Sequence, residues 1–301
     1  MYAVDLDGLN AQFAVADHVS FRAGHAGLPV ADIANIHAAA KISLHGAHVT
    51  AFQPHGQHPV LWLSDYCHWE AGKAVRGGIP VCWPWFAAHP ADSGKPAHGF
   101  VRTAMWKVMA TEALANGATQ ITFGFTESEA TLALWPYAFQ LELVVTVGAV
   151  LQVELVAHNT GNEEFVCGGA LHSYFRVSDV TEIAVRGLEG CTYIDSLDLP
   201  YRKLQEGPVT ISAETDRIYV DTTADCIIDD PGMGRRIRIV RKGSRSVVVW
   251  NPWKDKAARM EDFGDQEYPG MICVETTNAA DDVVTVPSLG EHRLQTVISV
   301  E

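Results

Sequence analysis

The chain has few cations and no long apolar run. Its 301 residues include 22 Lys and Arg against 36 Asp and Glu, for a formal net charge of −14. Nucleic acids and anionic membrane surfaces attract basic proteins, so we expect neither as a partner. The longest apolar stretch, near Leu143 to Leu151, contains Thr146 and Gly148 and is too short to span a bilayer. The acidic start of the chain lacks the basic-then-apolar order of a secretory signal, so we expect a soluble, cytoplasmic protein.

Several common chemical motifs are also missing. There is no G-x-G-x-x-G, no phosphate-binding P-loop and no G-x-S-x-G, so nothing supports a nicotinamide enzyme, a nucleotide triphosphatase or a serine hydrolase. The six cysteines are scattered without a C-x-x-C pair, which predicts free thiols in a reducing compartment. We therefore expect no cofactor.

Histidine is concentrated in one part of the chain without forming a metal motif. Eight of the thirteen histidines fall between His37 and His98, including the pairs His45/His48 and His55/His58. Residues three apart on a strand point to opposite faces, so neither pair chelates naturally. No Cys cluster or H-E-x-x-H accompanies them, and we expect no metal site.

The dominant hydrophobic period is two, which is typical of strands. Two β-rich runs, Leu141 to Val147 and Leu151 to His158, are split by Gly148-Ala149 and predict a hairpin. Helical signals are weak, with a turn at Asp32–Ala39 and a short helix at Lys256–Phe263. The fold class expected is all-β: a large antiparallel β-sandwich forming a single domain over residues 1–301. Further strands are expected at Ile42–Phe52, Gln120–Thr126, Glu182–Arg186, Arg236–Val240, Ser246–Trp250, Met271–Glu275 and Thr296–Val300.

Two arginines and a histidine lie close together in a stretch rich in Gly, Pro and Trp. The segment R-G-G-I-P-V-C-W-P-W-F begins at Arg76, and P-A-H-G-F-V-R contains His98 and ends at Arg102. Guanidinium groups present a planar fork of donors that suits a phosphate or carboxylate. Glycine lets backbone approach a ligand, while proline and tryptophan stiffen pocket walls. In so acidic a chain, this pattern predicts a dedicated anion site.

A histidine and a glutamate stand out as acid–base candidates. His172 lies in the apolar and aromatic segment G-G-A-L-H-S-Y-F-R, and Glu275 ends the apolar run Met271 to Val274. Histidine titrates near neutral pH, and desolvation raises the pKa of a carboxyl group toward that of a useful base. Together they could donate one proton and remove another without a cofactor.

Each candidate also has a purely structural explanation. His172 could be a hydrogen-bonded core histidine, and Glu275 a solvated residue at a strand edge. Asp216 beside Arg217 could form a surface ion pair, which contributes little to stability. Salt-bridge roles suit Arg76 and Arg102, and the pairs Trp83/Trp85 and Trp250/Trp253 fit either a core or the wall of a sugar pocket.

The motifs together resemble the glucose-6-phosphate 1-epimerase family, within the wider aldose 1-epimerase group. The two arginine segments and V-W-N-P-W at 249–253 are specific, and L-H-S-Y-F-R at 171–176, E-T-D-R-I-Y at 214–219 and M-I-C-V-E at 271–275 follow in the family's order. The resemblance implies a galactose-mutarotase-type β-supersandwich and cofactor-free interconversion of the α and β anomers of hexose 6-phosphates. Glucose 6-phosphate is the first candidate substrate, and the sequence does not decide which hexose phosphate is preferred. One departure is Ala87-Ala88-His89, where the family often has glycine after Phe86.

The resemblance also implies roles for individual residues. His172 matches the general acid that protonates the ring oxygen, and Glu275 the base that takes the C1 hydroxyl proton. Arg76 and Arg102 match arginines around the 6-phosphate. The sugar-binding candidates are His98, Asp216, Trp250 and, less strongly, Asp195.

Two other functions remain open at this level. One is a mutarotase of unphosphorylated aldoses, which has no need for two guanidinium groups. The other is a non-catalytic sugar-phosphate sensor, against which the presence of both His172 and Glu275 argues. For the assembly we expect a monomer or a weak homo-oligomer.

Overall fold

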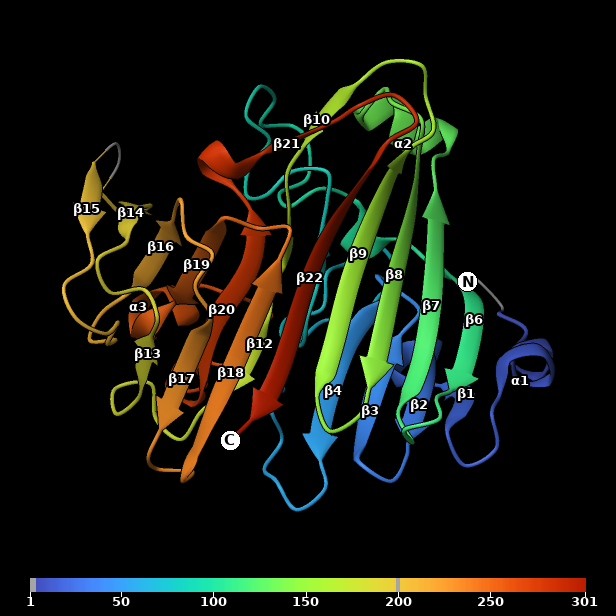
Figure 1. Ribbon diagram of the computed structural model, residues 1–301, viewed down its shortest axis with the longest axis horizontal. Coiled ribbons are helices and arrows are strands. Elements are labelled where there is room, and N and C mark those ends of the chain that lie inside the picture. The colour runs from blue at the N-terminus through green and yellow to red at the C-terminus, as the bar shows by residue number, and fades with distance from the viewer. Residues whose placement is uncertain (1–3, 199–200) are drawn as a thin grey trace.

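Two large sheets form the body of the protein (Figure 1). The computed structural model describes residues 4–198 and 201–301, and the named strands in these ranges pair antiparallel. The first eight-stranded sheet has the order β13 (Ala184–Arg186), β17 (Cys226–Asp230), β18 (Arg235–Lys242), β22 (Glu291–Val300), β9 (Leu151–Asn159), β8 (Phe139–Val147), β7 (Thr119–Thr126) and β6 (Lys107–Ala113).

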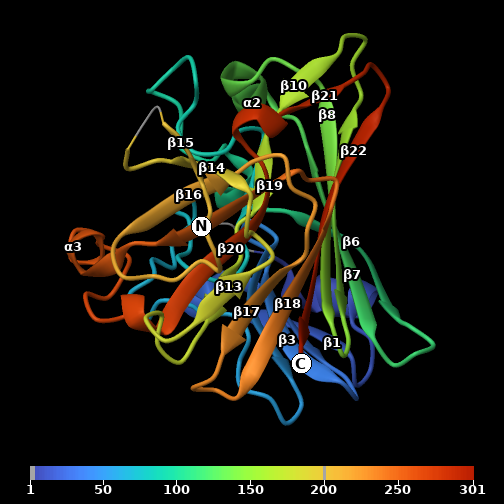
Figure 2. The same ribbon diagram turned by 60° about the vertical axis from the view of Figure 1, so that its left-hand side comes forward.

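The second eight-stranded sheet, called the site sheet below, lies behind the first in Figure 1. Its order is β15 (Arg202–Leu204), β14 (Thr192–Asp195), β16 (Thr215–Tyr219), β19 (Ser246–Asn251), β20 (Met271–Asn278), β11 (Gly169–Leu171) and β5 (Val81–Cys82), with β12 (Tyr174–Arg176) also pairing with β20. Figure 2 shows the same layers from a second direction.

Smaller elements complete the fold. A four-stranded sheet has the order β1 (Val19–Ala23), β2 (Pro29–Ala34), β3 (Ala38–Ser43), β4 (His48–Pro54), and β10 (Phe165–Cys167) pairs with β21 (Val284–Val286). The helices are α1 (Leu6–Phe13), α2 (Glu129–Leu134) and α3 (Trp253–Ala257), with 3₁₀ turns η1 (His25–Gly27), η2 (Val101–Thr103), η3 (Tyr268–Gly270) and η4 (Ala280–Asp282). Among the described residues no helix has the length and apolar character that crossing a membrane requires. The prediction of an all-β antiparallel fold is confirmed.

The predicted hairpin is the pair β8 and β9. Leu143 faces Leu155 in the register, and the alternate residues of both strands are buried. The period of two in the sequence therefore reports a real difference between an inward and an outward face.

Three local predictions were wrong. Asp32–Ala39 is not a helical turn: Ile33 and Ala40 are buried cross-strand partners of β2 and β3, and the Asn35 side chain accepts hydrogen bonds from the N–H groups of the next turn residues. The expected strand Ile42–Phe52 is broken after Ser43, where Gly46 and Ala47 adopt positive φ. The helix expected at Lys256–Phe263 is the single turn α3, which ends at Ala257.

The site sheet separates two hydrophobic clusters. On β19 and β20, Val247, Val249, Ile272 and Val274 belong to the main core, which draws residues from Val19 to Ile298. The intervening residues, Val248, Trp250, Met271 and Cys273, pack instead with Trp62 and Phe263 in a second cluster. Because side chains alternate along a strand, Glu275 shares the face of Met271 and Cys273. The second-cluster face is therefore where polar and aromatic candidates meet.

Candidate active site

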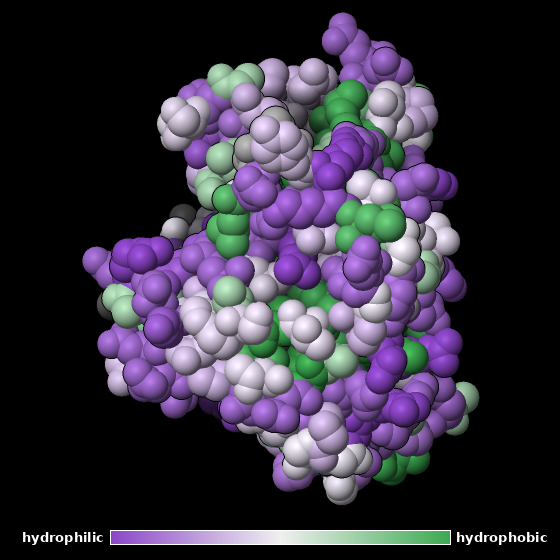
Figure 3. Space-filling model, turned by 90° about the vertical axis from the view of Figure 1, so that its left-hand side faces the viewer, coloured by the Kyte–Doolittle hydropathy of each residue, from purple (hydrophilic) through white to green (hydrophobic). Residues whose placement is uncertain are grey.

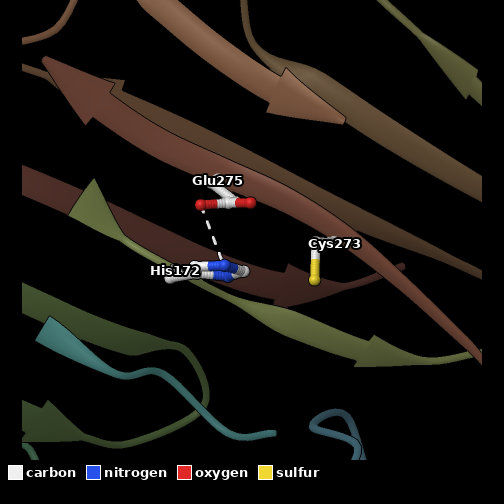
Figure 4. Close-up of side chains that lie close together, drawn as sticks. All are labelled: His172, Cys273 and Glu275. Atoms are coloured by element: carbon white, nitrogen blue, oxygen red, sulfur yellow. Dashed lines mark ion pairs between the residues drawn. The ribbon is translucent and has the colours of Figure 1, made fainter. Parts of the chain in front are cut away.

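His172 approaches Glu275 at a gap between two short strands, β11 and β12, that both pair with β20. Leu171 is the register partner of Thr276, and Tyr174 that of Cys273, so His172 lies in the short interruption between β11 and β12. Its Nδ1 is 3.3 Å from Oε2 of Glu275 (Figure 4). His172 is 6% exposed and Glu275 1%. Two residues more than 100 positions apart thus meet in a nearly dry environment.

The facing atoms of the His172–Glu275 pair, Nδ1 and Oε2, have no hydrogen-bond partner among the described residues. The two atoms also lack hydrogen-bond geometry toward one another. Burial raises the pKa of Glu275, with a further contribution from Asp216. Burial also lowers the pKa of His172, assisted by the charges of His98, Arg102 and Arg76. Both shifts favour the neutral form of each group.

Aromatic rings fix the orientation of the imidazole. Tyr174 stacks on His172 with ring centroids 4.7 Å apart and an interplanar angle of 7°. The Trp250 ring meets the same imidazole edge-on, with centroids 6.5 Å apart, and the Phe86 ring centroid lies 6.3 Å from that of His172. This packing limits rotation of the imidazole and keeps Nδ1 directed toward Glu275. A fixed orientation of the ring nitrogens is what acid–base chemistry requires.

One row of side chains crosses the site sheet. Tyr174, Cys273, Trp250 and Asp216 are successive register partners on β12, β20, β19 and β16. Directly opposed residues of antiparallel strands have Cβ atoms about 5 Å apart, so the row forms a continuous floor. Asp216 is 28% exposed in its side chain, and its pKa is raised, mainly by burial. Lys256 has its Nζ 4.0 Å from this carboxylate and lies over the Trp250 ring.

Asp195 is placed differently from Asp216. It is the register partner of Arg217, the neighbour of Asp216, and so belongs to the opposite face of the sheet. Burial would raise its pKa, but the bond from Lys203 at 2.8 Å and the Leu197 N–H hold it below the usual value. The structure brings Asp216 to the row of site residues and does not bring Asp195.

Arg76 is already engaged by protein groups. Its Nη1 donates to the Tyr174 hydroxyl at 3.0 Å, and its Nε and Nη2 lie 3.2 and 3.1 Å from Oδ2 of Asp262. The guanidinium therefore touches the ring that stacks on His172. The structural explanation for Arg76, a salt bridge, is present in this state of the protein.

Arg102 lies at the end of the second arginine segment, in η2, and donates to the Ala97 carbonyl at 3.0 Å. Its side chain forms no ion pair with a carboxylate in the described ranges 4–198 and 201–301. Its positive charge nonetheless acts to lower the pKa of His98, His172 and Glu275. Arg102 is therefore a half-buried cation without a carboxylate partner among the described residues.

His98 joins the site through a strained loop. Its φ is +64°, and its ring centroid is 5.6 Å from that of His172 and 4.9 Å from that of Phe86. Its Nδ1 accepts a bond from the Ala87 N–H at 3.3 Å, which leaves Nε2 as the other polar atom of the ring. Burial, with the charges of Arg102 and Arg76, lowers the pKa of His98 to about 3, so the ring is neutral at physiological pH.

The departure noted after Phe86 has a structural counterpart. Ala87 adopts a φ of +58°, in the left-handed region that glycine favours. Its carbonyl accepts a hydrogen bond from the His98 N–H, and its own N–H donates to Nδ1 of the His98 ring. The loop thus holds an alanine in a backbone conformation that is strained for any residue with a Cβ, next to the candidate ligand group His98.

Sequence reasoning missed three residues of the site. Tyr174 lies within the motif that contains His172, and the periodicity of β20 could have placed Cys273 on the face of Glu275. Asp262 gave no signal, because it lies in an irregular segment nearly 190 residues after Arg76.

Known proteins match both the sequence and the fold. The sequence matches the family described as aldose 1-epimerase over residues 30–299. A protein of Salmonella typhimurium, provisionally named a glucose-6-phosphate 1-epimerase, is 39% identical over 80% of each chain. One from Escherichia coli with the same provisional name is 36% identical over 86% of each chain. A crystal structure from Salmonella typhimurium, provisionally described as a mutarotase, superposes with a TM-score of 0.89 at 34% identity, covering 96% of this chain and 95% of that one. The chain belongs to the aldose 1-epimerase family, the enzymes that interconvert the anomers of sugars.

Proposed function

We propose that the protein interconverts the α and β anomers of hexose 6-phosphates, with glucose 6-phosphate as the preferred substrate. The observation that carries this proposal is the buried His172–Glu275 pair, with two arginines whose charges act on it. The names of relatives at 36–39% identity support the phosphorylated substrate.

In the proposed mechanism, His172 donates a proton to the ring oxygen while Glu275 removes the proton of the C1 hydroxyl. The C1–O5 bond breaks, a C1 carbonyl forms, and rotation about C1–C2 presents the other face. The reverse transfers then close the ring with the opposite configuration. Each correctly placed acid or base contributes about 10²–10⁴-fold, which suffices for a reaction that already proceeds in water.

Burial assists the opening step. Before transfer, the working pair is an imidazolium and a carboxylate; afterwards, it is a neutral imidazole and a carboxylic acid. Desolvation lowers the pKa of His172 and raises that of Glu275, so both shifts favour the state reached when the ring opens. The pair holds one proton in either state, and no proton from solvent is needed during a turnover.

The remaining site residues are proposed to hold the sugar. Trp250 provides an aromatic wall, and Asp216 and the neutral His98 supply hydrogen bonds to sugar hydroxyls. Arg102 and Arg76 are proposed to bind the 6-phosphate. For Arg76 this requires the phosphate to compete with Asp262, whose carboxylate now occupies the guanidinium. Binding energy from the phosphate would orient C1 between the acid and the base.

A mutarotase of unphosphorylated aldoses is the second candidate. The observation that favours it is the contact of Arg76 with Asp262 and Tyr174, which already satisfies much of that guanidinium. On either alternative the protein is proposed to work in the cytoplasm, in keeping with its six free thiols.

Anomer exchange measured by NMR tests the proposal. Glucose 6-phosphate and glucose are compared with wild-type protein, Arg102→Ala and Arg186→Ala, the last being an exposed arginine of β13 in the other large sheet. We expect Arg102→Ala to lower kcat/KM for the phosphosugar by about 10–100-fold, the value of a charge-assisted hydrogen bond, with little change for glucose. Arg186→Ala should change neither rate. An equal loss for both sugars would remove the phosphate site from the proposal.

A further inference from the structure

Cys273 joins His172 and Glu275 in a compact group of metal-ligand side chains. One ligand atom from each lies within 4.8 Å of the other two, and all three residues are buried (Figure 4). Cys273 and Glu275 are two residues apart on β20 and therefore share one face, while His172 approaches from between β11 and β12. We propose that these three residues bind a thiophilic divalent cation, such as Zn²⁺ or Cd²⁺, and that the ion and the sugar exclude one another.

The donor set and its spacing suit a tetrahedral ion. Imidazole nitrogen, thiolate sulfur and carboxylate oxygen are the ligands that Zn²⁺ takes, and three protein ligands leave a fourth position for water. With Zn–N and Zn–O bonds of about 2.0–2.1 Å, the edge of such a tetrahedron is about 3.3–3.4 Å. The separation of Nδ1 of His172 and Oε2 of Glu275 is 3.3 Å. The sulfur needs a movement on the order of 1 Å, within reach of a side-chain rotation.

The facing atoms of His172 and Glu275 have nothing else to bind. Both are buried and without a hydrogen-bond partner among the residues described. A cation between them would satisfy the two together, where a proton at this geometry does not. An unpartnered imidazole nitrogen beside an unpartnered carboxylate oxygen is thus an independent sign of a missing ligand.

Charge balance sets the conditions for binding. A dication neutralises one thiolate and one carboxylate. The thiol proton and the one proton held by the His172–Glu275 pair are both released to solvent when the ion binds. Arg76 and Arg102 oppose the added charge, and Asp216 favours it. We therefore expect reversible binding that a chelator removes.

The sugar and the ion compete for the same atoms. Catalysis as proposed above needs a proton on the imidazole and a free lone pair on the carboxylate, and an ion bound to these two groups displaces the proton and occupies the lone pair. Micromolar thiophilic metal should consequently slow anomer exchange, and ethylenediaminetetraacetate should restore it. Inhibition rests on the proposed function, but binding does not, so binding is measured first.

Co²⁺ is the probe, because a cobalt–thiolate bond gives a near-ultraviolet charge-transfer band and tetrahedral Co²⁺ absorbs strongly in the visible. Tag-free, chelator-treated protein is titrated as wild type, Cys273→Ser and Cys226→Ser, the last being a buried thiol of β17 in the other large sheet. We expect Cys273→Ser to lose the charge-transfer band and to bind Co²⁺ at least about tenfold more weakly. Cys226→Ser should keep both properties, and Zn²⁺ should displace the cobalt.

Further arms of the experiment separate the possible failures. Glu275→Gln should retain the band with about tenfold weaker binding, because the sulfur ligand remains. If circular dichroism shows that Cys273→Ser does not fold, Cys273→Ala provides the same comparison. Glucose 6-phosphate should reduce the band more than inorganic phosphate at equal concentration. Absence of a charge-transfer band in wild type, or its persistence without the Cys273 thiol, would overturn the metal site whatever the enzymatic rate.

Discussion

Replacing Glu275 by glutamine should abolish anomer exchange and at the same time change how stability depends on pH. Glutamine keeps the shape of the side chain in a position that is 1% exposed, so no cavity forms. Loss of the base should lower kcat by about 10²–10⁴-fold. The effect on stability follows from the raised pKa of the native carboxyl group.

The magnitude follows from proton linkage. In the unfolded chain, Glu275 titrates near its ordinary pKa of 4.5, whereas in the folded protein burial raises its pKa well above that value. Between the two pKa values, the folded state holds one more proton, so its stability falls by about 1.4 kcal/mol per pH unit as the pH rises. Glutamine does not titrate. The free energy of unfolding of Glu275→Gln relative to wild type should therefore rise by up to about 2.7 kcal/mol from pH 5 to pH 7.

Urea unfolding of both proteins at pH 5, 6, 7 and 8 measures this difference. The pH-independent cost of burying an amide enters at every pH and cancels from the slope. The lowered pKa of His172 has the opposite effect, because it reduces the free energy of unfolding as the pH falls below 6.5. His172 is present in both proteins, so this effect enters both curves. The matched control is Glu291→Gln, because Arg293 holds the pKa of this exposed carboxylate below its usual value. The free energy of unfolding of Glu291→Gln relative to wild type should therefore not vary between pH 5 and pH 8. A flat difference for Glu275→Gln as well would show that the carboxylate is ionised normally and would refute the desolvation argument.

Two further predictions follow from the fold around the site. Asp216→Asn should lower kcat/KM by about tenfold or more, whereas Asp195→Asn should leave it within about twofold, because the two aspartates lie on opposite faces of the site sheet; NMR exchange rates decide, and equal losses would contradict the assignment. Gly99→Ala should destabilise the protein by about 3 kcal/mol or more, because a Cβ would lie 1.8 Å from the Trp83 carbonyl oxygen at a φ of +72°; an unchanged urea midpoint would show that the loop gives way freely.

The sequence predicts well what depends on alternation and poorly what depends on local breaks. The hairpin of β8 and β9 follows from the period of two, and the strands around Ser246 and Met271 follow from short, continuous runs of β-branched and other apolar residues. The segment near Asp32 contains enough alanine to resemble a helix, but pairing with neighbouring strands outweighed that propensity. Long-range pairing decides such segments, and a single sequence does not display it.

The same distinction holds for the site. His172, Glu275 and Arg76 were selected by residue type and motif, and the structure brings them into one neighbourhood. The choice between Asp195 and Asp216 could not be made, because it depends on which face of β14 and β16 each one occupies. Asp262 could not be foreseen, since its contact with Arg76 joins two irregular segments.

The alternation on β20 places the demands of folding and of chemistry on neighbouring residues. Ile272 and Val274 fill the main core, while Cys273 and Glu275 lie on the opposite face, near His172. A one-residue insertion or deletion in this strand would exchange the two sets, driving a carboxylate into the core and a valine into the site. The strand can accordingly be varied by substitution but not by length. Attempts to alter substrate preference should change every second residue of β16 and β19 and leave the residues between them untouched.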